Sequence, residues 1–249
     1  MSPPIRAFPD LEALSRAAAD DWIAIARAAV AARGRCAIAL SGGSTPKKLF
    51  EVLAARGAGA VPWANVDLWW GDERTVPPDH ADSNYRMTKQ ALLDPLAIDP
   101  AHVHRIAGED PDPAAAARTY EQALVAALGT PPLFDLVLLG LGPDAHTASL
   151  FPGTTALAAP ADRFVVANPV DSPVAKGKTV RITLTAHAIN AARAVRFLIA
   201  GADKAEALAH VIDGPRDPQR FPAQLVAPRS GDLALLCDTA ATARLAGRA

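Results

Sequence analysis

Short, mostly apolar runs divide this sequence, and they constrain its fold more than any other feature. The clearest are residues 36–40 (CAIAL), 66–70 (VDLWW) and 134–141 (FDLVLLGL), in which apolar and polar side chains do not alternate. A strand with one face in water alternates, whereas a strand of a parallel sheet is covered on both faces and reads as a continuous apolar run. These segments therefore predict buried strands of a mostly parallel sheet.

Helical patterns separate the apolar runs. Residues 11–32 place apolar side chains at helical spacing behind Asp10, and Thr45 followed by Pro46 predicts a cap and a helix over 46–55. We expect further helices over 85–93, 113–128 and 203–212, from 187 onward and at the end of the chain, and further strands at 164–167, 180–184, 195–200 and 233–237. This alternation predicts a doubly wound α/β fold with helices on both faces of the sheet. No linker interrupts it, so we expect one domain over residues 1–249.

Composition excludes several classes of protein. The 249 residues carry a formal net charge of −1 without a basic block, which argues against a nucleic-acid partner. No apolar run reaches the roughly 18 residues of a membrane span, and the N-terminal sequence lacks the pattern of a signal peptide. Cys36 and Cys237 both lie in apolar, strand-like runs and are interpreted as core thiols. We therefore expect a cytoplasmic protein without a membrane partner.

Parallel sheets bind ligands beyond the carboxyl ends of their strands, and three loops of this sequence occupy that position. The first loop follows the strand at 36–40 and contains Ser41, Gly42, Gly43, Ser44 and Thr45. Its two glycines let backbone N–H groups approach an anion, and the hydroxyls and the following helix add donors. The loop is a candidate phosphate cradle, although a plain strand–turn–helix connection also explains the glycines.

The second and third loops carry charged and titratable groups. Asp72 and Arg74 follow the strand at 66–70, where Arg74 can bind a phosphate or carboxylate and Asp72 can accept sugar hydroxyls or act as a base. A solvated charged loop is the alternative. Asp144 and His146 follow the most apolar strand, and histidine is a suitable general base at neutral pH when a carboxylate fixes its tautomer. The alternative there is a loop histidine without a role.

A basic cluster is the last candidate binding site, and the usual motifs of metal and nucleotide binding are absent. Lys176, Lys178 and Arg181 lie in the stretch VAKGKTVRITLT, which is either a solvated turn or a second anion-binding loop. No HxxxH or CxxC spacing points to a metal ion, and no GxGxxG follows a strand, so we expect neither a metal nor a nucleotide cofactor.

Taken together, these loops resemble the 6-phosphogluconolactonase family. The resemblance rests on SGGSTPKKLFEVLA, WWGDERTVPPDHADSNYRM, FDLVLLGLGPDAHTASLFPG and KGKTVRITLT, in this order, and it covers essentially the whole chain. It implies a Rossmann-like fold of the ribose-5-phosphate isomerase/CoA-transferase type. It also implies hydrolysis of 6-phospho-D-glucono-1,5-lactone in the pentose phosphate pathway, without a cofactor, by a monomer or small homo-oligomer.

The resemblance further implies roles for individual residues. His146 would be the general base that activates water, and Asp144 would orient it or hold the sugar. Alanine at position 145 departs from the family, which commonly has glycine there; a positive φ at this position would cost about 1 kcal/mol or more. The residues implied to grip the phosphate and the sugar are Ser41, Gly42, Gly43, Ser44, Thr45, Asp72, Arg74, Lys176 and Arg181.

The sequence also allows two alternative functions. Glucosamine-6-phosphate isomerases share the first loop, but they supply a glutamate soon after the histidine, whereas no acid follows His146 before Asp162. A sugar-phosphate sensor without activity would need an appended DNA-binding segment, and the first expected helix begins by Leu11. Both alternatives are less favoured than the lactonase.

Overall fold

The computed structural model describes residues 3–246, and a seven-stranded sheet forms the centre of this part of the chain. The strand order is β1-β10-β9-β6-β2-β3-β5, and each neighbouring pair is parallel. This confirms the predicted parallel sheet, to which the structure adds the edge strand β1. The strands are β1 (Ile5–Phe8), β2 (Cys36–Leu40), β3 (Val66–Trp70), β5 (Val103–His104), β6 (Leu136–Leu139), β9 (Ala194–Ile199) and β10 (Asp232–Asp238).

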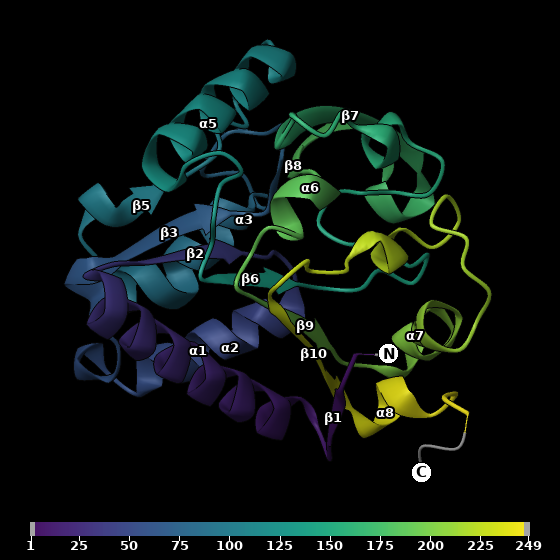
Figure 1. Ribbon diagram of the computed structural model, residues 1–249, viewed down its shortest axis with the longest axis horizontal. Helices are drawn as coiled ribbons and strands as arrows, with labels where there is room; N and C mark the ends of the chain where they lie inside the picture. Colours follow the sequence, from purple (N-terminus) through teal and green to yellow (C-terminus); the bar gives the residue numbers. More distant parts are fainter. Residues whose placement is uncertain (1–2, 247–249) are drawn as a thin grey trace.

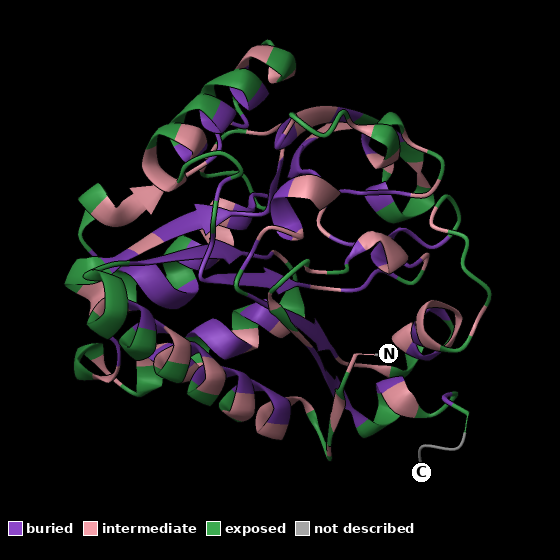
Figure 2. Cartoon of the chain, in the orientation of Figure 1, coloured by how far each residue is buried: buried purple, intermediate pink, exposed green. Residues whose placement is uncertain are grey.

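Helices cover both faces of the large sheet, which confirms the doubly wound α/β fold (Figure 1). Helices α1 (Leu11–Arg33) and α2 (Ser44–Ala55) lie on one side, and α5 (Pro113–Leu128), α6 (Ala186–Ile189) and α7 (Ala205–Ile212) lie on the other. The inner strands between these two layers are mostly buried, whereas the edge strands β1 and β5 are only partly buried (Figure 2). Shorter helices also occur in the described chain: α3 (Asn84–Thr88) with a π-helical turn at Lys89–Leu93, α4 (Asp94–Leu96) and α8 (Thr239–Thr242).

Helix α2 begins earlier than the sequence predicts. Its N-cap is Gly43 rather than Thr45, and the carbonyl of Gly43 accepts the first helical bond, from the N–H of Lys47. The φ of Gly43 is +102°, a backbone conformation that favours glycine and allows the chain to turn directly from β2 into the helix. Ser44 and Thr45 therefore belong to the first turn of α2, and no side chain caps them.

A separate three-stranded antiparallel sheet stands beside the large one, in the order β4-β8-β7. Its strands are β4 (Asp72–Arg74), β7 (Val165–Ser172) and β8 (Gly177–Leu184). The strands predicted at 164–167 and 180–184 are parts of β7 and β8, so they lie outside the parallel sheet. A short turn, Pro173–Ala175, joins β7 and β8, and a connection of this length permits antiparallel pairing only.

One glycine joins the two sheets. The N–H of Gly71 donates to the carbonyl of Leu40 in β2, and its own carbonyl accepts from the N–H of Leu184 in β8, both at 2.8 Å. A Cβ atom at position 71 would lie 3.3 Å from the Leu40 carbonyl oxygen, closer than nearly all real Cβ contacts. The small sheet therefore begins directly where the chain leaves the carboxyl end of β3.

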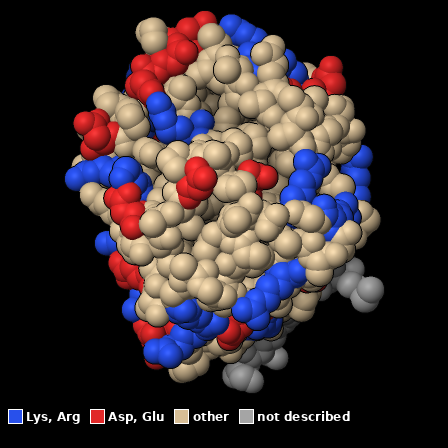
Figure 3. All heavy atoms as spheres, turned by 90° about the vertical axis from the view of Figure 1, so that its left-hand side faces the viewer, with Lys and Arg blue, Asp and Glu red and all other residues tan. Residues whose placement is uncertain are grey.

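The visible surface carries charges of both signs, and both cysteines are buried in the core. On the face that Figure 3 presents, acidic and basic side chains are interspersed among wide uncharged areas. Cys36 and Cys237 are free and buried, and burial raises the pKa of each thiol to about 12. None of the helices within residues 3–246 has the length and apolar character that crossing a membrane requires.

Candidate active site

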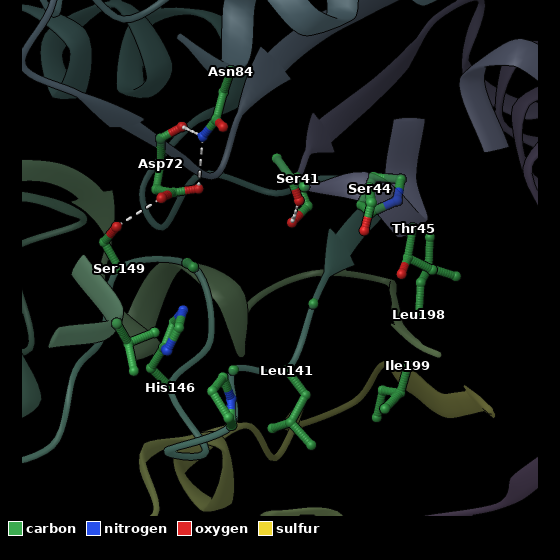
Figure 4. A pocket seen from close by; sticks show the side chains of 18 of the residues that line it. Ser41, Ser44, Thr45, Asp72, Asn84, Leu141, His146, Ser149, Leu198 and Ile199 are labelled. Carbon is green, nitrogen blue, oxygen red and sulfur yellow. Dashed lines mark hydrogen bonds between the residues drawn. The ribbon is translucent and has the colours of Figure 1, made fainter. Parts of the chain in front are cut away.

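A cavity of about 270 Å³ opens at the carboxyl ends of β2, β3, β6 and β9, beside the small sheet (Figure 4). It gathers the predicted loops, which are far apart in sequence. In the close view, Asp72, Ser149 and His146 lie on one side of the cavity, and Ser44 and Thr45 lie on the other. Among the predicted site residues, those that line the cavity are Ser41, Gly42, Gly43, Ser44, Thr45, Asp72, Arg74, His146 and Arg181.

The loop after β2 presents backbone donors to the cavity. The first N–H groups of any helix have no acceptor within the helix, and in α2 no side chain of the cap residue satisfies them. The N–H groups of Ser44 and Thr45 therefore remain available to an anion, which the helix dipole also attracts. Glycine at position 42 lets the Asn84 side chain pack directly against the backbone of this loop, because a Cβ atom there would lie 1.8 Å from Oδ1 of Asn84.

Asp72 joins the loops after β3 and β6. Asn84 Nδ2 donates to the backbone carbonyl of Asp72 at 2.9 Å and to its Oδ1 at 3.2 Å, while Ser149 Oγ donates to Oδ2 at 2.6 Å. Asp72 is only 7% exposed, so a solvated charged loop does not describe it. Ser149 and Asn84 were not among the predicted site residues, because no local sequence pattern marks them as partners of Asp72.

Glu73 supports the loop from below and points away from the cavity. Its carboxylate accepts the N–H groups of Arg74, Asn84 and Tyr85, each at 2.8 Å, and the Ser83 hydroxyl at 3.1 Å. Burial raises the pKa of Glu73, although the three backbone donors act in the opposite direction. Glu73 thus fixes the path of the chain between Arg74 and α3.

Two arginines face each other across the small sheet at the edge of the cavity. Arg74 on β4 is the direct partner of Arg181 on β8, and both side chains are half-buried. Arg74 Nη1 donates to the carbonyl of Asp82, and Arg181 Nη2 donates to the carbonyl of Ala175 at 3.2 Å. Burial lowers the pKa of Arg181, and the charge of Arg74 lowers it further. Like charges placed directly opposite destabilise a sheet, so this pair favours an anion between or beside them.

The structure places the lysines differently from the sequence analysis. Lys176 lies on the turn between β7 and β8, is exposed, and forms an ion pair with Asp82 at 2.6 Å without lining the cavity. Lys178 is also exposed. Lys204, which follows β9, lines the cavity instead. Parallel sheets bind ligands beyond the carboxyl ends of their strands, and this carboxyl-end rule, applied to the predicted strand at 195–200, would have identified Lys204 as a candidate.

The loop after β6 holds His146 and Asp144 together. Asp144 Oδ1 lies 2.5 Å from His146 Nδ1 and also accepts the backbone N–H of His146 at 3.2 Å. Burial alone would raise the pKa of Asp144, but its hydrogen bonds and charge interaction with His146 outweigh this and lower it. An ionised carboxylate only accepts hydrogen bonds, so Nδ1 carries the ring proton. Nε2 has no hydrogen-bond partner among residues 3–246 and is available to the cavity.

Ala145 adopts the strained conformation that the sequence analysis considered. Its φ is +61°, and its side chain is completely buried. Hydrogen bonds hold the residue on both sides, from its N–H to the Gly142 carbonyl and from the Ala223 N–H to its own carbonyl, each at 3.0 Å. The turn between Asp144 and His146 therefore forms with alanine in place of glycine.

Comparisons with known proteins fit this arrangement. A profile of the family described as glucosamine-6-phosphate isomerases/6-phosphogluconolactonase matches residues 9–235. The chain belongs to this family. A relative named 6-phosphogluconolactonase from Nostoc sp. is 42% identical over 249 residues, which cover 98% of this chain and 99% of the relative. Another, from Synechocystis sp., is 45% identical over 214 residues, which cover 84% of this chain and 85% of the relative.

Solved structures of this family share the fold. The 6-phosphogluconolactonase from Trypanosoma cruzi has a TM-score of 0.86 and 31% identity, and the match covers 99% of this chain and 98% of that chain. A monomeric glucosamine-6-phosphate deaminase has a TM-score of 0.82 at 21% identity, covering 97% and 99% of the two chains, and this likeness shows the fold alone. Because the family profile joins two activities, the residues of the site must distinguish them.

Proposed function

We propose that this protein hydrolyses 6-phospho-D-glucono-1,5-lactone to 6-phospho-D-gluconate, in the oxidative branch of the pentose phosphate pathway. The observation that carries the proposal is one cavity that combines a histidine with a free Nε2 and a paired set of arginines. The histidine suits activation of water, and the arginines suit a phosphorylated substrate. Relatives named for this reaction match nearly the whole chain.

The phosphate group is the natural ligand of the positively charged groups of the cavity. Lys204, Arg74 and Arg181 line the cavity, and the N–H groups at the start of α2 add donors without charge. Binding energy from this remote group orients the lactone ring, whose hydroxyls we assign to Asp72.

The proposed reaction needs one base and no covalent intermediate, because a lactone is already an activated ester. His146 Nε2 takes a proton from water, and the resulting hydroxide attacks the lactone carbonyl carbon to form a tetrahedral intermediate. The intermediate collapses with cleavage of the bond to the ring oxygen, which receives the proton back from Nε2. Asp144 holds the Nδ1 proton and stabilises the imidazolium between these two steps. A base placed in this way contributes about 10²–10⁴-fold to the rate.

The residues after His146 favour the lactonase over the isomerase. Ser149, Leu150 and Phe151 occupy the segment in which the isomerase would need a carboxylate, and Ser149 is already engaged with Asp72. We therefore expect no release of ammonia from glucosamine 6-phosphate.

Acid release from freshly generated 6-phosphogluconolactone, measured above the spontaneous rate, tests the proposal. We expect rapid turnover by the wild type and at least a 100-fold lower kcat for His146→Ala, with folding intact by circular dichroism. His210→Ala is the matched control, because this histidine stacks on Phe221 outside the cavity and should retain activity. An inactive wild type would refute the proposed function. Full activity of folded His146→Ala would refute the assignment of the base.

We also propose that the enzyme works in the cytoplasm, as a monomer or small homo-oligomer and without a cofactor. Its free, buried cysteines suit a reducing compartment. Within residues 3–246, no group of three or more His, Cys, Asp or Glu side chains is placed to hold a metal ion. Activity that survives dialysis against a chelator would support this part, and light scattering would give the oligomeric state.

A further inference from the structure

The ring of Phe151 lies against the proposed base. The centroids of the Phe151 and His146 rings are 4.2 Å apart and their planes differ by 17°, so the two rings are stacked. We infer that Phe151 is a positioning residue that fixes the plane of the His146 imidazole and so directs Nε2 at the attacking water. This inference rests on the proposed function, since it concerns the same base.

A hydrogen bond to Asp144 does not by itself fix the ring. The contact joins Nδ1 to Oδ1 at 2.5 Å, and it sets the position of one ring atom. The imidazole can still rotate about that contact and swing Nε2 out of line. The lone pair of Nε2 lies in the ring plane, so its direction changes with any tilt of that plane. A stacked ring opposes this motion, and Asp144 and Phe151 together define the direction of the lone pair.

The backbone of Gly142 bounds the imidazole closely, and it does so without a side chain. A Cβ atom at Gly142 would lie 2.0 Å from His146 Nδ1 and 2.1 Å from its Cε1. This side of the ring is therefore bounded by a glycine, which contributes no side chain. Among the described residues, Phe151 provides the aromatic contact of His146. The surface of its ring also favours the imidazolium that forms during the reaction, by a cation–π interaction.

Phe151 is anchored in the hairpin and not in the main core. It is 4% exposed and packs with Val170 of β7 and Ala175 of the β7–β8 turn, in an apolar cluster separate from the large core. The carbonyl of Ala175 accepts a hydrogen bond from Arg181. The hairpin that holds one of the cavity's arginines thus also holds the ring that supports the base.

Steady-state kinetics of Phe151→Leu and Val170→Ala test this role. Phe151→Leu keeps an apolar side chain but removes the stacked ring, and we expect kcat to fall at least tenfold while KM stays within about twofold, because small misplacements of a reacting group are costly. Val170→Ala loosens the cluster that anchors Phe151 but keeps the stacked ring, so we expect a smaller fall in kcat than in Phe151→Leu. Phe151→Met is the second variant, because its flexible side chain fills the site if leucine prevents folding.

Relaxation of the ¹³C nuclei in the His146 ring provides a readout that does not depend on activity. We expect a rigid ring in the wild type and a clear fall in its order parameter in Phe151→Leu, larger than the fall in Val170→Ala. Unchanged ring mobility in Phe151→Leu, retained kcat in this variant, or an equal loss of kcat in Val170→Ala would each overturn the inference. If the wild type proves inactive on the lactone, the proposed function fails, and ring mobility alone decides whether Phe151 positions His146.

Discussion

Replacing Arg181 with glutamine tests the interpretation of the arginine pair. The change keeps a shorter polar side chain and removes the charge that faces Arg74 across the small sheet. If the pair exists to bind an anion, the variant should lose affinity for the phosphorylated ligand while the ligand-free protein keeps its stability. A purely structural arginine would show the opposite pattern.

The expected magnitudes follow from the contacts. A hydrogen bond to a charged group contributes about 1.5–3 kcal/mol, which corresponds to a KM or Kd higher by about 10- to 150-fold. In the ligand-free protein, the variant loses the 3.2 Å bond to the Ala175 carbonyl, which contributes about 0.5–1.5 kcal/mol. It also gains relief from a like-charged cross-strand pair, worth about 0.2–1 kcal/mol. The two terms nearly cancel, so the free energy of unfolding should change by less than about 1 kcal/mol.

Thermal unfolding with and without 6-phosphogluconate separates these terms. At a ligand concentration 100 times Kd, the wild type gains about 2.7 kcal/mol, or roughly 5–11 °C in Tm for a chain of this size. At the same concentration the variant should gain at most about half of that. Lys178→Gln is the matched control, because it removes a charge from an exposed residue of the same strand outside the cavity. A ligand-induced shift of wild-type size in Arg181→Gln, or a large loss of its ligand-free Tm, would refute the reasoning.

Three further variants probe the supporting structure. Asp144→Asn should lower kcat about 100-fold or more. Because the pKa of Asp144 is lowered in the fold, its stabilising effect is present above the unfolded pKa of about 3.9 and is lost as the pH falls through the folded pKa. In urea unfolding, the stabilities of the wild type and the variant should therefore converge in acid. Glu73→Gln should destabilise the chain by about 1–3 kcal/mol in urea unfolding, because one amide nitrogen then faces donors such as the Tyr85 N–H. Ala145→Gly should shift Tm by less than about 4 °C, because opposing effects nearly cancel. Glycine relieves about 1–2 kcal/mol of backbone strain at φ +61°. The variant also loses a buried methyl group, worth about 0.8 kcal/mol, and gains a more flexible unfolded chain, which costs about 0.5–1 kcal/mol.

The parts of this fold that depend on local burial could be predicted from the sequence. The runs at 36–40 and 66–70 are continuous because both faces of β2 and β3 are covered, and the carboxyl-end rule places the loops that follow them at one cavity. Strand β1 escaped prediction because it has only four residues and lies at the edge of the sheet, where its burial is incomplete.

Contacts between distant segments could not be predicted in this way. Ser149 and Asp72 are 77 residues apart, and nothing in either local sequence indicates that a hydroxyl will meet a carboxylate. Lys176 stands in a basic run typical of anion binding, yet its position at a hairpin turn directs it to Asp82. Tertiary topology, and not residue type, decides both cases.

The hydrogen bonds on either side of Gly71 limit which sequence changes this enzyme can accept. His146 follows a strand of the large sheet, whereas Arg181 belongs to the small one, and the two sheets meet through hydrogen bonds on either side of Gly71. Substitutions at exposed hairpin residues such as Lys178 leave this join untouched and keep the distance between base and anion site. A Cβ atom at Gly71, in contrast, would lie 3.3 Å from the Leu40 carbonyl oxygen and crowd the join itself. We therefore expect few substitutions to be tolerated at this position.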